Sequence, residues 1–148
     1  MSPRADQFAD VDPAAAARWH NIAASGQTLF PQLLGLSVED VRDGYCRMRM
    51  PFRAELLHAG GIVHGGALSS LLDSVLVPAI GVTLPAGAVY STVDLHVQFV
   101  DSLVDEDAVA EGWIVRRGRR TVFGESEVRA ANTERLIAKA ISTFIVRA

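Results

Sequence analysis

The sequence is poor in cysteine and in charged residues, and each shortage excludes a class of protein. Cys46 is the only cysteine among 148 residues, so no disulfide can form within the chain. Without a Cys-x-x-Cys pair or a Cys/His array, we expect no metal site. Charged residues make up 21% and the net charge is -3, which argues against nucleic acid as the main partner. The 49% of hydrophobic residues indicates a globular chain.

Apolar segments long enough for a signal peptide or a membrane span are also missing. Residues 1–12 are polar and acidic, without an apolar core, so we expect a flexible tail there and no signal peptide. The stretch 67–89 contains Asp73, Pro78 and Pro85, which suits a buried helix and its exit loop better than a bilayer span. We therefore expect a cytoplasmic protein that does not act at a membrane.

Residues 13–148 are expected to form one domain, which begins with a helix. Asp12-Pro13 has the form of a helix N-cap followed by proline at the first helical position. This pair predicts a helix over residues 13–25 that ends at Gly26. The segment 30–35 is expected to be a connection.

After residue 36 most of the sequence alternates with the period of a strand. Strands are predicted at 36–41, 45–52, 89–100, 108–117, 121–130 and 136–146. Asp43-Gly44 predicts a tight hairpin between the first two. In the strand 89–100 the alternation places Thr92 and Asp94 on one side and Val93 and Leu95 on the other.

One long apolar helix is predicted between the second and third strands, over residues 65–81. Its main apolar face follows the i, i+3, i+4 spacing of an α-helix. That face contains Leu68, Leu71, Leu72, Val75, Leu76 and Ala79. Almost the whole helix surface is apolar, so we expect protein on most sides, and Pro78 should disturb its last turns. The predicted fold is therefore α+β, an antiparallel sheet wrapped around one central helix, with an extra N-terminal helix.

The start of this helix combines three features that suit acyl-transfer chemistry. His64-Gly65-Gly66 lies at the predicted helix N-terminus, where backbone N–H groups lack intrahelical partners and can stabilise an oxyanion. Glycine lets a substrate approach the backbone closely. Asp73 follows the histidine by nine residues, within an apolar surface. Its carboxylate could act as a general base or attack directly as a nucleophile.

His64-Gly65-Gly66, the acid nine residues later and the strand segment from Ser91 to Asp94 together resemble the hotdog-fold acyl-CoA thioesterases, within them the PaaI-like group. The resemblance covers residues 34–146. It implies a sheet wrapped around the long helix, and two subunits that pair edge to edge with active sites at the homodimer interface. Dimers of such proteins can pair further into tetramers. It implies hydrolysis of acyl-CoA without a separate cofactor, since coenzyme A is part of the substrate.

The resemblance also implies roles for individual residues. Asp73 would be the catalytic carboxylate, and the Gly65 or Gly66 N–H would bind the thioester carbonyl oxygen. Thr92 matches a position that often holds a Ser or Thr that helps to place the attacking water. His64 would fix the loop and the dimer contact. His64 and Ser91 are also candidates for binding the substrate.

One position departs from the family pattern. Six residues before the histidine of the motif, many relatives carry Asn or Gln, which holds the water or the carbonyl. This chain has His58 there, which can form hydrogen bonds but also titrates near neutral pH. We keep His58 as a candidate catalytic residue.

Four arginines within five residues are candidates for binding the phosphates of coenzyme A. They are Arg116, Arg117, Arg119 and Arg120. The same cluster could be a solvated hairpin tip. Asp73 likewise could be a structural acid that bonds Ser69, Ser70 or a neighbouring strand.

Two other functions fit the same residues. A non-catalytic acyl-CoA binding or sensing module is one, because His58 replaces the usual amide and a fold alone does not specify chemistry. A hotdog enoyl-CoA hydratase or dehydratase is the other, because such enzymes pair a catalytic His with an acid, here His58 or His64 with Asp73.

Overall fold

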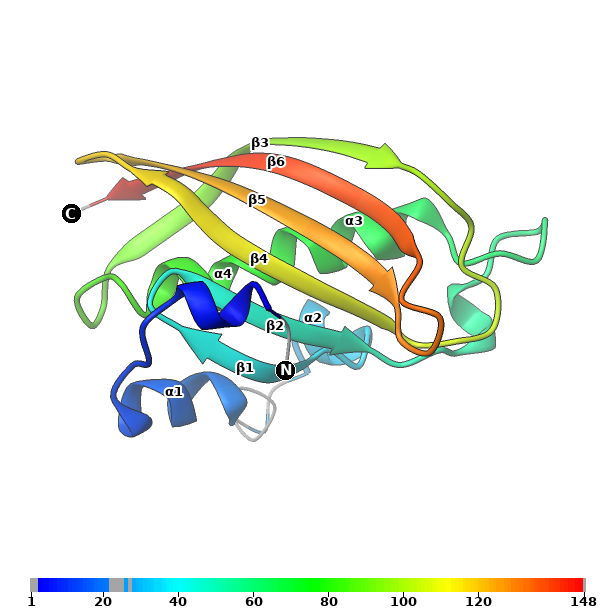
Figure 1. The fold of residues 1–148 in the computed structure, drawn as a ribbon, viewed down its shortest axis with the longest axis horizontal. Coiled ribbons are helices and arrows are strands. Elements are labelled where there is room, and N and C mark those ends of the chain that lie inside the picture. Colours follow the sequence, from blue (N-terminus) through cyan, green and yellow to red (C-terminus); the bar gives the residue numbers. More distant parts are fainter. Residues whose placement is uncertain (1–2, 22–25, 27, 148) are drawn as a thin grey trace.

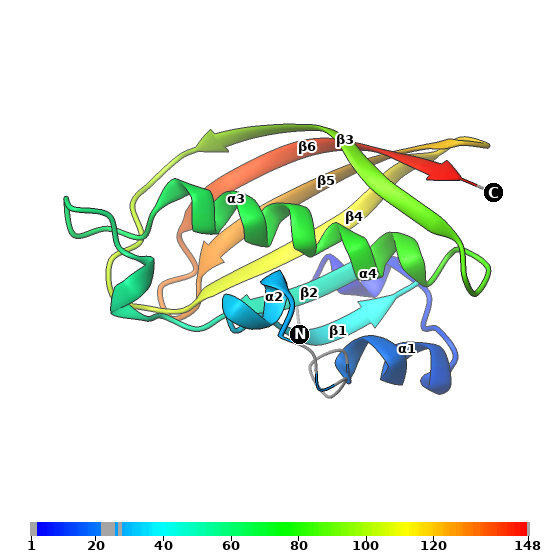
Figure 2. The ribbon, with the colours of Figure 1, turned by 180° about the vertical axis from the view of Figure 1, so that it is seen from behind.

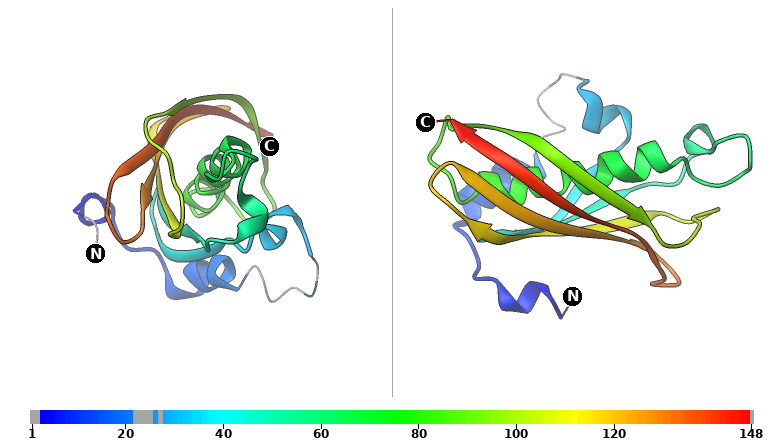
Figure 3. Two further views of the ribbon diagram at one scale, coloured as in Figure 1. Left: turned by 90° about the vertical axis from the view of Figure 1, so that its right-hand side faces the viewer. Right: turned by 90° about the horizontal axis from the view of Figure 1, so that it is seen from above.

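The computed structural model, which describes residues 3–21, 26 and 28–147, contains one sheet of six antiparallel strands. Along the sheet the order is β1-β2-β4-β5-β6-β3, so β3 and β1 are the two edges (Figure 1). The strands are β1 (Ser37–Arg42), β2 (Tyr45–Met50), β3 (Val89–Phe99), β4 (Ala108–Arg117), β5 (Thr121–Ala130) and β6 (Leu136–Arg147). All six strands predicted from the alternation are confirmed, and the sheet curls around a central helix (Figure 3).

The central helix is divided into α3 (Gly65–Ser74) and α4 (Leu76–Gly81), which run almost end to end through the concave side of the sheet (Figure 2). Pro78 accounts for the division, because it has no N–H to donate to the Ser74 carbonyl four residues earlier. Val75 bridges the two pieces with helical backbone angles. This confirms the predicted α+β hotdog architecture. No helix within the described ranges is long and apolar enough to cross a membrane.

The predicted apolar face of the helix is the centre of the core. All six of its side chains are at most 3% exposed, and each large one stabilises the fold by roughly 1.5–3 kcal/mol. Two strand glycines allow the close approach. A Cβ at Gly112 would lie 2.8 Å from Val75 Cγ1, and one at Gly124 would lie 2.8 Å from Leu76 Cδ2. The helix therefore rests directly on the backbone of β4 and β5.

Strand β3 contains an irregularity that the alternation did not predict. Its register against β6 shifts between Thr92 and Asp94. Before the shift Thr92 faces α3, and after it Leu95 and Val97 pack against the core. The prediction that Thr92 and Asp94 share a side is wrong, because the extra residue of a bulge reverses the alternation.

The N-terminal helix α1 (Pro13–His20) lies beside β1 at the edge of the sheet (Figure 1). Asp12 caps it as predicted, with Oδ1 accepting from the Ala14 N–H at 2.8 Å. Trp19 is buried against Gly81 at the end of α4. The helix ends at His20, earlier than predicted, and the predicted continuation through 22–25 falls on residues that the structure does not describe.

The segment expected to be a flexible tail makes defined contacts with the outer face of the sheet. Residues Ala5–Gln7 form a short 3-10 helix, and Ala5 is buried with Tyr45 and Trp113. The ring of Phe8 stacks on Tyr45 with centroids 5.3 Å apart. Burial of these apolar groups holds the segment on the sheet.

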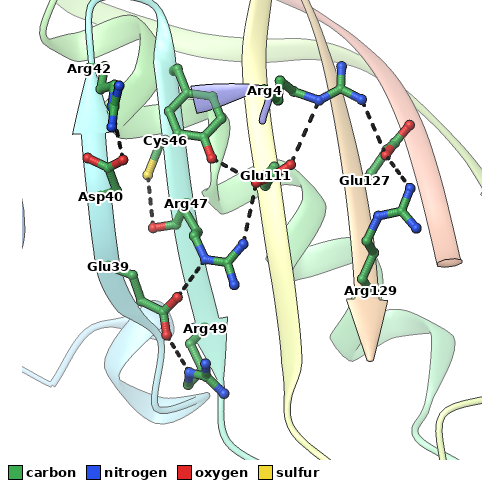
Figure 4. A network of polar contacts seen from close by, with 11 residues as sticks. Arg4, Glu39, Asp40, Arg42, Cys46, Arg47, Arg49, Glu111, Glu127 and Arg129 are labelled. Atoms are coloured by element: carbon green, nitrogen blue, oxygen red, sulfur yellow. Dashed lines mark hydrogen bonds and ion pairs between the residues drawn. The ribbon is translucent and has the colours of Figure 1, made fainter. Parts of the chain in front are cut away.

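Charge reinforces this attachment. The Arg4 guanidinium lies 3.6 Å from the centroid of the Trp113 ring and pairs with Glu111 at 3.8 Å and Glu127 at 3.5 Å (Figure 4). Glu111 also accepts a hydrogen bond from the buried Tyr45 hydroxyl at 2.9 Å. Residues 4–8 therefore cover a polar network that crosses β2, β4 and β5.

Gly112→Val is expected to destabilise the fold by about 1–3 kcal/mol, because the new side chain would enter space occupied by Val75. Urea unfolding measures the change, with Gly112→Ala as a smaller step at the same position. Equal stability of wild type and Gly112→Val would contradict the close packing of helix on sheet.

Candidate active site

His64 is the N-cap of α3, and its side chain closes the first turn. Its Nδ1 accepts the Gly66 N–H at 2.8 Å, so the ring proton is on Nε2. The His64 carbonyl accepts from Ala67 at 2.9 Å and Leu68 at 3.3 Å. Among the described residues, no acceptor takes the Gly65 N–H. Of the two N–H groups predicted to bind an oxyanion, Gly66 is occupied by the cap and Gly65 is available.

Asp73 and Thr92, which the sequence places on different elements, meet in the structure. The Thr92 hydroxyl donates to Asp73 Oδ1 at 2.7 Å, from β3 across to α3, and both residues are half-buried. The hydroxyls of Ser69 and Ser70 instead donate to the Gly65 and Gly66 carbonyls, each at 2.8 Å. The strand partner considered for Asp73 is therefore present, and the two serine partners are not.

Ser91 is the neighbour of Thr92 but points away from the helix. Successive side chains of a strand lie on opposite faces, and Ser91 is exposed whereas Thr92 is half-buried. The structure thus separates Ser91 from Asp73.

His58 lies in the loop that leads into α3. The loop is closed by an isolated bridge between Leu57 and Val63 and by the His58 N–H, which donates to the Ile62 carbonyl at 3.0 Å. His58 Nδ1 accepts the Gly60 N–H at 2.7 Å. The exposed His58 ring meets the His64 ring edge-on, with centroids 6.4 Å apart. The two histidines are therefore neighbours at the helix entrance.

The four arginines lie at the other end of the molecule. Arg116 and Arg117 end β4, Arg119 and Arg120 lie in the turn before β5, and all four are exposed. Arg117 donates to the Thr83 carbonyl, which ties this hairpin to the end of α4. A helix rises 1.5 Å per residue, so residues 65 and 81 are about 24 Å apart along the axis. Figure 1 shows the hairpin and the loop before α3 at opposite ends.

The free N–H and the carboxylate are also separated within one chain. Gly65 and Asp73 are eight residues apart on α3, which corresponds to about 12 Å along the axis. A reacting carbonyl group needs both an oxyanion donor and a base or nucleophile at roughly 3 Å. Within one chain, the Gly65 N–H and the Asp73 carboxylate are therefore too far apart to act on the same carbonyl group.

Phe99 is part of the helix entrance, although its sequence context does not single it out. A Cβ added to Gly65 would lie 2.9 Å from Phe99 Cζ, so this half-exposed ring covers the glycine. Phe99 and Gly65 are 34 positions apart in the sequence, and the alternating pattern of a strand does not predict their contact. A side chain at position 65 would make the Phe99 ring shift.

Two other buried ionisable groups lie outside this region. Burial and the hydrogen bond to Glu111 raise the pKa of Tyr45 on the outer face of the sheet. Burial also raises the pKa of the Cys46 thiol, which keeps it protonated and suits packing rather than nucleophilic chemistry. Within the described part of the chain, no group of three or more His, Cys, Asp or Glu side chains could hold a metal ion.

Comparison with known proteins relates the chain to esterases and thioesterases. A family model described as the thioesterase superfamily matches residues 60–137, which contain the central helix, Asp73 and Thr92. A protein of Halobacterium salinarum, provisionally named an esterase, is 34% identical over 124 residues, 80% of this chain and 80% of its own.

Solved structures share the fold along most of the chain. A conserved protein of Pseudomonas aeruginosa superposes with a TM-score of 0.76 at 28% identity, over 82% of this chain and 95% of its own. The E. coli PaaI protein from the phenylacetic acid degradation operon superposes with a TM-score of 0.77, over 87% of this chain and 91% of its own. Its identity of 17% supports a common fold.

His64→Ala is expected to destabilise the protein by about 1 kcal/mol, because the Gly66 N–H loses its cap. His64→Asn, which retains a short side-chain acceptor, should restore most of the loss. Urea unfolding of the three proteins measures the difference. If alanine and asparagine have the same effect, the cap does not stabilise the helix start.

Proposed function

The chain belongs to the thioesterase superfamily, and from this premise we propose that it hydrolyses acyl-CoA thioesters to a free acid and coenzyme A. The observation that carries the proposal is the hydrogen bond from Thr92 to Asp73 Oδ1. It orients a half-buried carboxylate on the helix and leaves Oδ2 for a water molecule or a carbonyl carbon. Because Asp73 is only half-buried, its carboxylate remains within reach of a substrate.

The Gly65 N–H would supply the second requirement of thioester hydrolysis. It is at the positive end of α3, and a carbonyl oxygen bound there gains stabilisation as negative charge develops. Asp73 then takes a proton from water as the water oxygen bonds to the carbonyl carbon. The C–S bond breaks as the tetrahedral intermediate collapses, and the coenzyme A thiolate leaves and is protonated.

A direct attack by Asp73 is the alternative route to the same products. Its carboxylate would form a mixed anhydride as the thiolate leaves, and water would then hydrolyse the anhydride. The Thr92 hydrogen bond supports either route, since it fixes the direction of the carboxylate in both. Repeated turnover in H₂¹⁸O distinguishes them, because only an anhydride that water opens at the Asp73 carbonyl carbon places ¹⁸O in the Asp73 carboxylate.

The separation of Gly65 from Asp73 supports a homodimer with shared sites. β3 is a free edge strand that exposes Val89, Val93 and Phe99, and an antiparallel partner strand could extend the sheet there. A two-fold axis at this edge would reverse the second helix. The Gly65 N–H of one subunit would then face Asp73 and Thr92 of the other.

The same arrangement accounts for the position of the arginines. In a single chain they are about 24 Å from Gly65 along the helix. A reversed partner brings its own helix start toward the hairpin end of the first chain. Arg116, Arg117, Arg119 and Arg120 would then bind the phosphates of a coenzyme A whose thioester lies between the subunits.

His64, His58 and Ser91, the remaining candidate residues, have different roles in this proposal. His64 holds the first turn through its bond to Gly66, which leaves Gly65 free. The Nδ1 of His58 is occupied by Gly60, so its Nε2 is the nitrogen that can bond the water or the carbonyl. Ser91 points away from Asp73, and we assign it no part in bond cleavage.

Thiol release across acetyl-, octanoyl-, 3-phenylpropanoyl- and palmitoyl-CoA tests the reaction itself. Tight binding of these compounds without thiol release would favour a non-catalytic acyl-CoA module. Hydration of crotonyl-CoA would favour a hydratase. The Nδ1 atoms of His58 and His64 accept backbone hydrogen bonds, so each ring has only Nε2 for chemistry in either reaction.

Asp73→Asn is expected to lower kcat by about 10²–10⁴-fold, because an amide neither accepts the proton of water at neutral pH nor acts as a nucleophile. Asp105→Asn, in an exposed loop, is the matched control and should retain activity. Steady-state thiol release and circular dichroism separate lost chemistry from lost folding. Normal turnover by folded Asp73→Asn would overturn the assignment.

Gly65→Pro removes the proposed oxyanion donor and adds a contact with Phe99, and the helix should tolerate it. Proline is favoured at the first helical position, and the backbone angles of His64 (φ -60, ψ 132) allow a following proline. We expect kcat to fall by about 10²–10³-fold. Gly65→Ala adds a similar contact with Phe99 but keeps the N–H, so its loss should be much smaller. Equal losses would mean that crowding, and not the donor, is responsible.

A hybrid dimer tests whether the sites are shared. One subunit carries Asp73→Asn, the other carries Gly65→Pro, and different affinity tags allow the hybrid to be purified. If each site uses both chains, one of the two sites is intact and the hybrid has about half of the wild-type activity. If each site lies within one chain, both are defective and the hybrid is inactive.

A further inference from the structure

The one-turn helix α2 (Phe30–Leu33) exposes an unusual amount of apolar surface beside the start of α3. Leu29, Phe30 and Leu33 are 53%, 57% and 60% exposed. The sequence pattern predicts only a connection between elements over residues 30–35. Exposed apolar side chains that cluster in this way often mark a ligand-binding groove or a protein contact.

Hydrogen bonds hold this segment in place in spite of its exposure. The Gln32 side chain accepts the Leu29 N–H at 3.0 Å, and Arg53 Nη2 donates to the Leu33 carbonyl at 2.7 Å. The Leu36 N–H donates to the Pro31 carbonyl at 2.9 Å. The apolar side chains are therefore presented from a fixed backbone.

Between α2 and α3 lies a cavity of about 270 Å³. Its apolar walls are Phe30 and Leu34 on one side, Leu56 and Leu57 on a second, and Ala67 on α3. Gly66 and His64 also line it, so the cavity reaches the first turn of α3, next to the free N–H of Gly65. A carbonyl bound by that N–H would place its substituent at the mouth of this cavity.

We propose that this cavity is the acyl-binding site and that it selects an uncharged, apolar acyl group of intermediate size. The inference rests on the proposed thioesterase function and deepens it. The coenzyme A portion would leave the carbonyl on the side of the arginines. The acyl group would extend the other way, between Phe30 and Ala67.

The volume sets the size of the acyl group. An apolar cavity of about 150 Å³ holds one benzene ring, and ligand pockets for larger molecules run from roughly 300 to 1,000 Å³. A cavity of about 270 Å³ therefore suits a ring with a few added carbons, or a flexible chain of about eight carbons. An acetyl group would leave most of the cavity empty, and a palmitoyl group would extend out of it.

Charge sets a second limit. Glu55 lines the cavity and is exposed, in the short helix Ala54–Leu56 that follows Arg53. Its carboxylate would repel an acyl group that ends in a second carboxylate. Dicarboxylic acyl-CoAs should therefore be poor substrates compared with neutral ones of the same length.

The test compares acetyl-, octanoyl-, 3-phenylpropanoyl-, suberyl- and palmitoyl-CoA in wild type and Phe30→Ala. Wild type should prefer octanoyl- or 3-phenylpropanoyl-CoA, and whichever is better distinguishes a chain from a ring as the natural group. Phe30→Ala should lower kcat/KM for the preferred substrate by about 10-fold or more and leave acetyl-CoA almost unchanged. Leu33→Ala is the matched control, because Leu33 is equally exposed on α2 but does not line the cavity.

Other outcomes overturn the assignment in distinguishable ways. An unchanged profile in active Phe30→Ala means that the acyl group lies elsewhere. Equal effects of Phe30→Ala and Leu33→Ala, with a change in oligomeric state by light scattering, mean that α2 contacts another subunit. Calorimetry of octanoate binding tests the cavity separately from thiol release. If wild type releases no thiol but octanoate binds in a Phe30-dependent way, the proposed function fails and the cavity assignment stands.

Discussion

The close packing of one apolar helix on the backbone of the sheet is the constraint on which the rest of the structure depends. Gly112 and Gly124 leave room for Val75 and Leu76, so the helix sits in the curve of the sheet rather than above it (Figure 3). Burial of the apolar face fixes the rotation of the helix about its axis. The polar groups of α3 that remain accessible therefore lie on the rest of its surface, where Gly66, Ser70 and Asp73 follow helical spacing and Asp73 meets the edge strand β3.

Strand β3 contacts the helix on the side where Asp73 lies. Its first half is bonded to the helix by polar side chains: Tyr90 donates to the Val77 carbonyl at 2.8 Å and Thr92 to Asp73 at 2.7 Å. Its second half meets the core through Leu95 and Val97. The bulge between the halves makes both contacts possible, because without the extra residue the apolar side chains after Thr92 would point to solvent. The strand is also an edge of the sheet, so the Thr92–Asp73 contact and the edge that is proposed to pair in a dimer belong to one element.

Much of this arrangement was predictable because it is local. Periodicity alone predicts six strands and one long helix, and the spacing of His64, Gly65 and Asp73 sets their order along α3. The interruption near Val75 follows from the missing N–H of Pro78. Even the separation of Gly65 from Asp73 along the helix axis follows from helical rise, once they are placed eight residues apart. Contacts between distant segments have no such signal: Arg4 on Trp113, Phe99 over Gly65, and the cavity between α2 and α3 each join residues far apart in sequence.

The range of the interactions separates what the sequence predicts from what only the folded structure shows. Hydrogen-bonding geometry and side-chain period act over a few residues, so the sequence specifies which segments are helix or strand, which helix face is buried, and that an acid follows His64-Gly65-Gly66. Tertiary packing decides which of these groups are free to act. It shows that His64 occupies the Gly66 N–H and leaves that of Gly65, that Thr92 rather than Ser91 meets Asp73, and that the arginines lie at the far end of the helix. Each of these outcomes depends on how distant strands and loops meet the helix, and only the folded chain determines those meetings.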